Sequence, residues 1–261
     1  MNYTMQNAVM LVDADNTLWD TDGVFANAQL ALLTEIEALS GIKCPEQDRL
    51  AYVRRHDQAL AAVHHQHLKY PIQMLGSSLL SGLNGQTAED AATALVNGRA
   101  TRVSFKTAIV DRAISHYADA LGKIPELLPS VIEGLQAAWK RNISIIVLTE
   151  GRIEKQRSTI EAHHLGGYFS GVWEVKKDRE QFERLCRRFD GALVVVIGDQ
   201  PDRDIVPAKQ AGCMAVLVPS RFRPSWRTEA DEQAADFVAE NFSIAIKWSI
   251  DATDGDYPTR R

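Results

Sequence analysis

The feature that most constrains this chain is a short apolar run that stops abruptly at acidic residues. The run covers Val9–Val12, and Asp13 and Asp15 follow it before apolar residues return at Leu18. A run of this length that ends at polar, turn-forming residues is typical of a buried strand that leads into a loop. In open α/β sheets the reactive crevice lies just beyond the carboxyl ends of such strands. Two neighbouring carboxylates there indicate a bound cation that offsets their repulsion, although a solvated Asp/Asn turn explains the same residues.

Further apolar runs alternate with helical patterns in the second half of the chain. We predict strands over Ile143–Leu148, Tyr168–Val175, Ala192–Ile197, Met214–Val218 and Phe237–Val238, and a polar tail after Asp251. Near-continuous apolar strands that alternate with helices indicate a parallel sheet covered on both faces. The predicted fold class is therefore α/β, with a Rossmann-like parallel sheet and helices on both of its faces.

The segment between the first strand and the others contains only helical patterns. The simplest explanation is an all-helical insertion into one α/β domain. The predicted domains are thus a core, residues 1–20 and 126–261, and a helical cap, residues 21–125. An insertion at the carboxyl end of the first strand lies where a lid over an active site would be expected.

Composition excludes several classes of partner. The net charge of -5 and the pI near 5.8 argue against a nucleic-acid-binding surface. No segment is apolar enough to span a bilayer, so we expect no membrane partner. The three cysteines lack metal-ligand spacing and are expected to be free thiols in a reducing cytosol, and with no signal peptide at the N-terminus we expect a cytoplasmic protein. The sequence leaves the oligomeric state open.

Polar side chains follow four of the predicted strands. They are Asp13 and Asp15 after the first, Thr149 after the second, Lys176 and Lys177 after the third, and Asp199, Asp202, Arg203 and Asp204 after the fourth. Because the carboxyl ends of parallel strands meet at one edge, we expect these groups to converge. Carboxylates with a lysine and a hydroxyl suit a hard cation and an oxyanion, and Mg²⁺ prefers oxygen ligands.

In these residues the chain resembles the haloacid dehalogenase-like hydrolase superfamily, in its helical-cap form. The family pattern is a strand ending in DxDxT, a strand ending in Thr or Ser, a downstream Lys and a strand ending in GDxxxxD. The matching positions, in the same order, are Asp13-Ala14-Asp15-Asn16-Thr17, Thr149, Lys176, and Gly198-Asp199 with Asp204. Asn16 stands where Gly is frequent, but Asn tolerates similar backbone angles.

The resemblance implies a role for each matched residue. Asp13 would be the nucleophile that forms an aspartyl-phosphate. Asp15 would be the general acid and then the base, with its backbone carbonyl on the metal. Thr149 would hydrogen-bond a phosphoryl oxygen, helped by the N–H groups of Glu150 and Gly151 at a helix start.

The resemblance also implies a lysine and a metal site. Lys176 would pair with Asp13 and the phosphate, and it is preferred to Lys177 because it lies six residues before Phe182, the interval usual in the family. Asp199 would ligate Mg²⁺ directly, with Asp204 as a second or outer ligand. The implied metal ligands are Asp13, Asp15, Asp199 and Asp204.

A basic stretch of the helical segment has two readings. It contains Arg54, Arg55, His56, His64, His65 and His67. These residues would either contact an anionic substrate or form a polar helix face. We favour the polar face, because exposed polar faces are the common case.

The predicted function is a Mg²⁺-dependent phosphatase that hydrolyses a small phosphorylated metabolite through an aspartyl-phosphate. A phosphomutase shares every motif named above and stays an alternative. A haloacid dehalogenase does not need the acid at Asp15, and a non-catalytic binding protein would be expected to lose Asp13, Asp15 or Lys176. The substrate is not readable, because the cap would select it.

Overall fold

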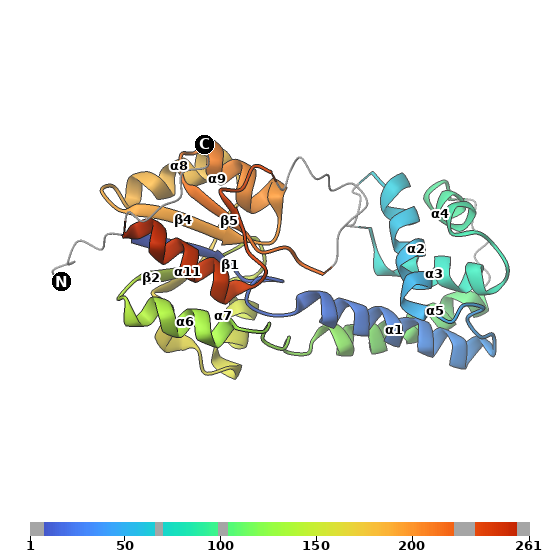
Figure 1. Ribbon diagram of the computed structural model, residues 1–261. Coiled ribbons are helices and arrows are strands. Elements are labelled where there is room, and N and C mark those ends of the chain that lie inside the picture. Colours follow the sequence, from blue (N-terminus) through green and yellow to red (C-terminus); the bar gives the residue numbers. More distant parts are fainter. Residues whose placement is uncertain (1–7, 66–69, 99–103, 222–232, 255–261) are drawn as a thin grey trace. The chain divides into compact units, whose positions relative to one another are not determined.

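The structure is a computed structural model that describes residues 8–65, 70–98, 104–221 and 233–254 (Figure 1). The chain divides into two compact units. The α/β unit comprises Met1–Asp22 and Ile124–Arg261, and the helical unit comprises Gly23–Lys123.

The α/β unit contains a six-stranded sheet in the order β3-β2-β1-β4-β5-β6, in which every pairing is parallel. The strands are β1 (Ala8–Asp13), β2 (Ser144–Thr149), β3 (Gly171–Glu174), β4 (Leu193–Gly198), β5 (Met214–Leu217) and β6 (Phe237–Val238). The strand that carries the acidic pair, β1, lies in the middle of the sheet between β2 and β4. Its carboxyl end is therefore flanked by the ends of both neighbours.

Helices cover both faces of this sheet because successive strand residues point to opposite sides. Met10 and Val12 pack in one core with α6 (Val131–Lys140), α7 (Ile153–Ala162) and α11 (Phe242–Thr253). Val9 and Leu11 pack in a second core with α8 (Arg179–Arg188) and α9 (Val206–Gln210). Figure 1 shows α8 and α9 on one side of the sheet and α6 and α11 on the other. The predicted fold class is confirmed.

Helix α11 was not predicted from the sequence, which indicated only a short last strand and a polar tail. The Asn241 side chain accepts a hydrogen bond from the Ile244 N–H at 3.1 Å and caps the helix. Phe242, Ile246 and Ile250 are buried one turn apart and pack in the first core. The last apolar helix thus completes one face of the sheet.

The helical unit contains most of α1 (Thr21–Ser40), then α2 (Arg49–Val63), α3 (Ile72–Leu83), α4 (Ala88–Val96) and α5 (Ser104–Leu121). Its own apolar core includes Leu32, Leu60, Leu79 and Val110. The helical patterns expected in this segment are present as helices. Among the residues described, no helix combines the length and the apolar character needed to cross a membrane.

Candidate active site

The loop after β1 turns sharply directly behind Asp13. Asn16 has a φ of 59°, a left-handed conformation that Asn adopts more readily than most residues. Two hydrogen bonds join Asn16 to Asp22. Asn16 Nδ2 donates to Asp22 Oδ1 at 3.0 Å, and the Asp22 N–H donates to Asn16 Oδ1 at 2.8 Å. Asn in place of Gly at this position therefore keeps the turn and adds two side-chain hydrogen bonds.

Three carboxylates meet at the carboxyl edge of the sheet, as predicted from the strand ends. Asp13, Asp199 and Asp204 are all buried, and one oxygen from each lies within 4.8 Å of the others. Asp13 ends β1, and Asp199 follows β4 directly. Parallel strands therefore bring together residues that are far apart in the sequence.

Asp204 reaches the cluster through an unusual turn. Residues Pro201–Ile205 form one turn of π-helix, a feature often found at functional sites. The turn closes where Asp204 Oδ2 accepts the Gln200 N–H at 3.0 Å. Gly198 makes room for this carboxylate, because a Cβ at Gly198 would lie 2.2 Å from Asp204 Cγ.

The lysine at the site is Lys177, so the prediction of Lys176 for this contact is wrong. The Lys177 ammonium is buried, pairs with Asp13 Oδ1, and lies 2.6 Å from Asp204 Oδ1. The Lys176 side chain is 79% exposed and pairs with Asp178 instead. The Asp178 N–H donates to the Lys176 carbonyl at 3.0 Å, so the chain turns at Lys177 and the two lysine side chains point in different directions. Glu150 fixes which of them faces the carboxylates, since its Oε1 accepts the Lys177 N–H at 3.0 Å.

Burial and charge act in opposite directions on this pair. Burial raises the pKa of the Asp13 carboxyl well above its ordinary value; the Lys177 ammonium opposes the rise, and the Asp204 and Asp199 carboxylates reinforce it. Burial lowers the pKa of Lys177, but the Asp13 and Asp204 carboxylates outweigh this effect and hold the pKa above its ordinary value. The Lys177 amine is therefore protonated, and the carboxylates of Asp13, Asp199 and Asp204 still repel one another.

The residues present fit a hard divalent cation. Asp13 Oδ2 is buried and has no hydrogen-bond partner among the described residues. A buried carboxylate oxygen without a partner is costly, and a cation bound by the cluster would satisfy it. Among the described His, Cys, Asp and Glu side chains, the group close enough to share one ion consists of Asp13, Asp199 and Asp204. The Asp15 carboxylate is not part of this group, and the predicted contact of the Asp15 backbone carbonyl with the metal stays a prediction.

Asp15 is instead held by two side chains that the sequence analysis missed. Thr21 Oγ1 donates to Asp15 Oδ1 at 2.6 Å, and Gln156 Nε2 donates to Asp15 Oδ2 at 2.9 Å. Thr21 lies at the start of α1, and Gln156 is a buried residue of α7. A polar residue on the buried side of a predicted helix was the available signal for Gln156, whereas Thr21 had none.

The segment after β2 is arranged differently from the expectation. Thr149 is buried at the end of β2, as predicted. However, α7 begins at Ile153, and the Gly151 N–H donates to Thr149 Oγ1 at 2.9 Å. In this structure the Gly151 N–H is therefore directed at a side chain. The Glu150 carboxylate also pairs with Arg203 at 3.3 Å.

With this geometry established, the comparisons with known proteins agree on the family. The family model for haloacid dehalogenase-like hydrolases matches residues 8–212, which is more than half of the chain. The chain belongs to the haloacid dehalogenase-like hydrolases. No curated protein sequence matches this hydrolase.

Solved structures share the fold of this hydrolase at low sequence identity. A haloacid dehalogenase-like family hydrolase from Xanthomonas campestris is 20% identical with a TM-score of 0.58, over 96% of this chain and 98% of that one. A predicted phosphoglycolate phosphatase from Haemophilus somnus is 19% identical with a TM-score of 0.55, over 95% of this chain and 100% of that one. At such identities the likeness establishes the fold alone.

The basic stretch of the helical unit does not form one continuous face. Arg55 is exposed and pairs with Glu46, whereas His56 is buried and hydrogen-bonds Ser78 Oγ at 2.8 Å through Nδ1. The His64 and His65 rings lie against each other, with centroids 4.5 Å apart. His67 lies outside the described residues. Contact of this stretch with a substrate stays the alternative to the favoured polar face.

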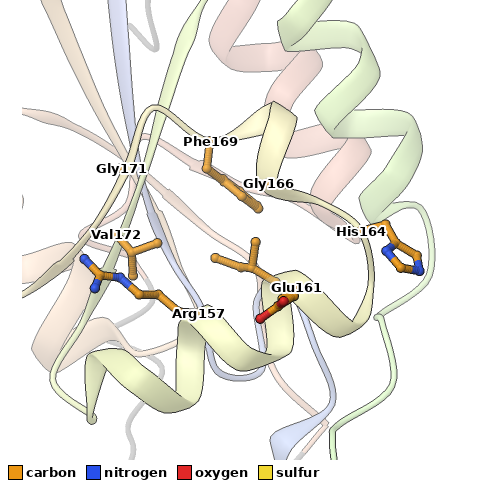
Figure 2. Close-up of a pocket in the computed structure, with 8 residues that line it drawn as sticks. Arg157, Glu161, His164, Gly166, Phe169, Gly171 and Val172 are labelled. Atoms are coloured by element: carbon orange, nitrogen blue, oxygen red, sulfur yellow. The ribbon is translucent and has the colours of Figure 1, made fainter.

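The hydrolase has a separate hollow next to the edge strand of the sheet (Figure 2). It measures about 400 Å³ and is lined by Arg157, Ile160, Glu161, His164, Gly166, Phe169, Gly171 and Val172. These residues come from α7, β3 and the connection between them. None of the predicted site residues lines it, so it is distinct from the carboxylate cluster.

Proposed function

We propose that this hydrolase is a Mg²⁺-dependent phosphatase that acts on a small phosphorylated metabolite through an aspartyl-phosphate. The observation that carries the proposal is the state of Asp13. One of its carboxylate oxygens is paired with a buried lysine, and the other is buried without a partner among the described residues, beside Asp199 and Asp204. A carboxylate prepared in this way can act as a nucleophile toward phosphorus.

In the first step Asp13 attacks the phosphorus of the substrate. A new bond forms between an Asp13 oxygen and phosphorus while the bond from phosphorus to the leaving oxygen breaks. Asp15, protonated, gives its proton to that leaving oxygen. The Lys177 ammonium holds Asp13 in place and offsets negative charge on the phosphoryl group, and the Thr149 hydroxyl donates to a phosphoryl oxygen.

In the second step Asp15 reverses its role. It takes a proton from a water molecule, and the water oxygen attacks the phosphorus of the aspartyl-phosphate. The bond from phosphorus to the Asp13 oxygen breaks, so phosphate leaves and Asp13 is regenerated. One residue can serve both steps because the leaving oxygen and the attacking water occupy the same side of the phosphoryl group.

Asp13, Asp199 and Asp204 are the residues that would hold Mg²⁺. When bound, the ion would supply charge stabilisation for the transferred phosphoryl group. Asp204 shares its Oδ1 with Lys177 and its Oδ2 with the Gln200 N–H, which favours it as an outer ligand.

The helical unit belongs to the same proposal. We propose that residues 21–125 form a cap domain that selects the substrate, while residues 1–20 and 126–261 form the catalytic core. A phosphomutase would use the same groups as those assigned here. It would transfer the phosphoryl group back to a second hydroxyl of the substrate, so product analysis separates the two reactions.

The test is phosphate release from a panel of sugar phosphates, nucleotides and phosphoglycolate, with Mg²⁺ or with EDTA. The wild type is compared with Asp13→Asn and with Asp202→Asn, a matched control at an exposed acid of the Pro201–Ile205 turn. We expect turnover that requires Mg²⁺, is abolished in Asp13→Asn and is kept in Asp202→Asn. Turnover that survives in Asp13→Asn would refute the nucleophile assignment.

A further inference from the structure

We propose that Gln156 is a positioning residue that orients both Asp15 and Thr149. These are the general acid–base and the phosphoryl-binding hydroxyl of the reaction, so the inference rests on the proposed function. It names a residue of α7 that lies outside the motifs used to find the site.

The Gln156 side chain bridges the two groups with one amide nitrogen. It is 1% exposed, and its Nε2 lies 2.9 Å from Asp15 Oδ2 and 3.4 Å from Thr149 Oγ1. A carboxylate only accepts hydrogen bonds, so the nitrogen end of the amide must face Asp15. The two hydrogens of that nitrogen are then divided between the carboxylate and the hydroxyl.

This arrangement determines which way the Thr149 hydroxyl points. A hydroxyl oxygen has two acceptor sites and one hydrogen. Thr149 Oγ1 accepts from the Gly151 N–H at 2.9 Å and from Gln156 at 3.4 Å, which uses both acceptor sites. Its own hydrogen is left to donate, and the oxygens of a phosphate monoester are acceptors. Gln156 thus keeps Thr149 in the donor state that binding a phosphoryl group requires.

The same amide fixes the rotation of the Asp15 carboxyl. Thr21 holds Oδ1 at 2.6 Å and Gln156 holds Oδ2 at 2.9 Å, from two different helices. With both contacts the plane of the carboxyl group is set, whereas with Thr21 alone the carboxyl can turn about the contact. General acid catalysis requires the proton to lie within hydrogen-bond reach of the leaving oxygen. Loss of Gln156 should therefore weaken the protonation of the leaving group.

A comparison of two leaving groups isolates this effect. p-Nitrophenolate departs as a stable anion, whereas the alkoxide of glycerol phosphate needs a proton. The variants are Gln156→Met, which keeps the length of the side chain, and Gln156→Glu, which keeps its shape but replaces the donor by an acceptor. The control is Thr159→Val, because Thr159 is also a buried polar residue of α7 and its hydroxyl donates to the Lys155 carbonyl.

We expect kcat/KM for glycerol phosphate to fall about tenfold or more in both Gln156 variants, since general acid catalysis contributes about 10²–10⁴ in rate. For p-nitrophenyl phosphate kcat/KM should fall by a clearly smaller factor, because the loss of Thr149 orientation affects both substrates whereas this leaving group needs no proton in the first step. Its kcat should fall, with a burst of p-nitrophenolate, because Asp15 must still activate water in the second step. Thr159→Val should leave all of these constants near those of the wild type.

Equal losses of kcat/KM for the two substrates would overturn the inference, because a merely structural defect does not distinguish leaving groups. The same pattern in Thr159→Val would overturn it as well. Thermal unfolding of each variant identifies the folded ones, and Gln156→Glu carries the test if Gln156→Met does not fold. A wild type that hydrolyses neither of these substrates nor any member of the substrate panel with Mg²⁺ would refute the proposed function.

Discussion

Replacement of Lys177 by Met should be far more damaging than the same change at its neighbour Lys176. The Lys177 side chain is 5% exposed and contacts Asp13 and Asp204, which are equally inaccessible. Met removes the ammonium and leaves two buried carboxylates without their cation. The Lys176 side chain is 79% exposed, and its ion pair with Asp178 lies at the surface.

The magnitudes follow from these environments. Breaking a buried ion pair by removing one partner costs about 3–5 kcal/mol. A change of 1 kcal/mol moves the unfolding temperature of a chain of this size by about 2–4 °C, so Lys177→Met should lower it by about 6–20 °C. A surface substitution such as Lys176→Met should leave the unfolding temperature close to that of the wild type.

The deficit of Lys177→Met should depend on pH. The raised pKa of Lys177 means that the lysine itself is fully charged below its ordinary value of 10.5. On the alkaline side its stabilising effect is lost as the pH rises through the folded-state pKa. In the Met variant nothing opposes the rise in the pKa of Asp13 caused by burial. Its carboxyl therefore holds a proton to higher pH, and the deficit should be largest near neutral pH and shrink as the pH falls.

The assay is thermal unfolding of the wild type and both variants from pH 4 to pH 8 in EDTA, with phosphate release measured in Mg²⁺. Lys177→Met should also lose turnover, whereas Lys176→Met should keep it. Equal stability and activity of the two variants would refute the assignment of the buried pair. A deficit that grows toward acid pH would refute the electrostatic explanation.

Three further predictions concern other parts of the chain. Burial lowers the pKa of His56 to about 4 from an ordinary value of 6.5, so the unfolded state binds the proton more readily and stability should fall by about 3 kcal/mol as the pH drops through this range. His56→Gln should flatten this part of the stability profile in urea unfolding. Gly198→Ala places a Cβ 2.2 Å from Asp204 Cγ, so overpacking should cost about 1–3 kcal/mol and turnover should collapse; an unchanged kcat would contradict the close approach. The Sγ atoms of Cys186 and Cys213 lie 2.6 Å apart, and burial raises the pKa of the Cys213 thiol. Diamide should therefore link them slowly, and faster at alkaline pH, as followed by loss of both free thiols; Cys186→Ser should prevent the link.

The architecture and the acidic edge could be predicted because each rests on a strong local pattern. The buried strands read as continuous apolar runs, and the ends of parallel strands converge whatever the details of packing. This reasoning placed Asp13, Asp199 and Asp204 at one edge, where the structure has them. Asn16 was expected to tolerate the backbone angles of Gly, and its φ of 59° agrees with this expectation.

The misses have physical causes. The choice between Lys176 and Lys177 depends on how the chain turns after β3, and a shift of one residue exchanges the two side chains. The interval before Phe182 does not determine which lysine faces the site. The hydrogen bond from the Lys177 N–H to the Glu150 carboxylate does determine it, and it appears only in the structure. Gln156 acts through contacts with residues distant in sequence, and its polar side chain on the buried side of a predicted helix does not indicate which residues it contacts.

The net charge of the carboxylate cluster also predicts the charge of the cation that it would bind. Asp13, Asp199, Asp204 and Lys177, taken as four ionised groups, sum to three negative charges and one positive charge, which is a net charge of -2. A divalent cation neutralises this sum, whereas a monovalent ion leaves half of it. A proton on Asp13 is the competing way to reduce the same charge, and burial favours that proton. Acid should therefore displace the ion from a folded protein, so the acid limb of an activity profile would report competition between a proton and a metal for one carboxylate oxygen.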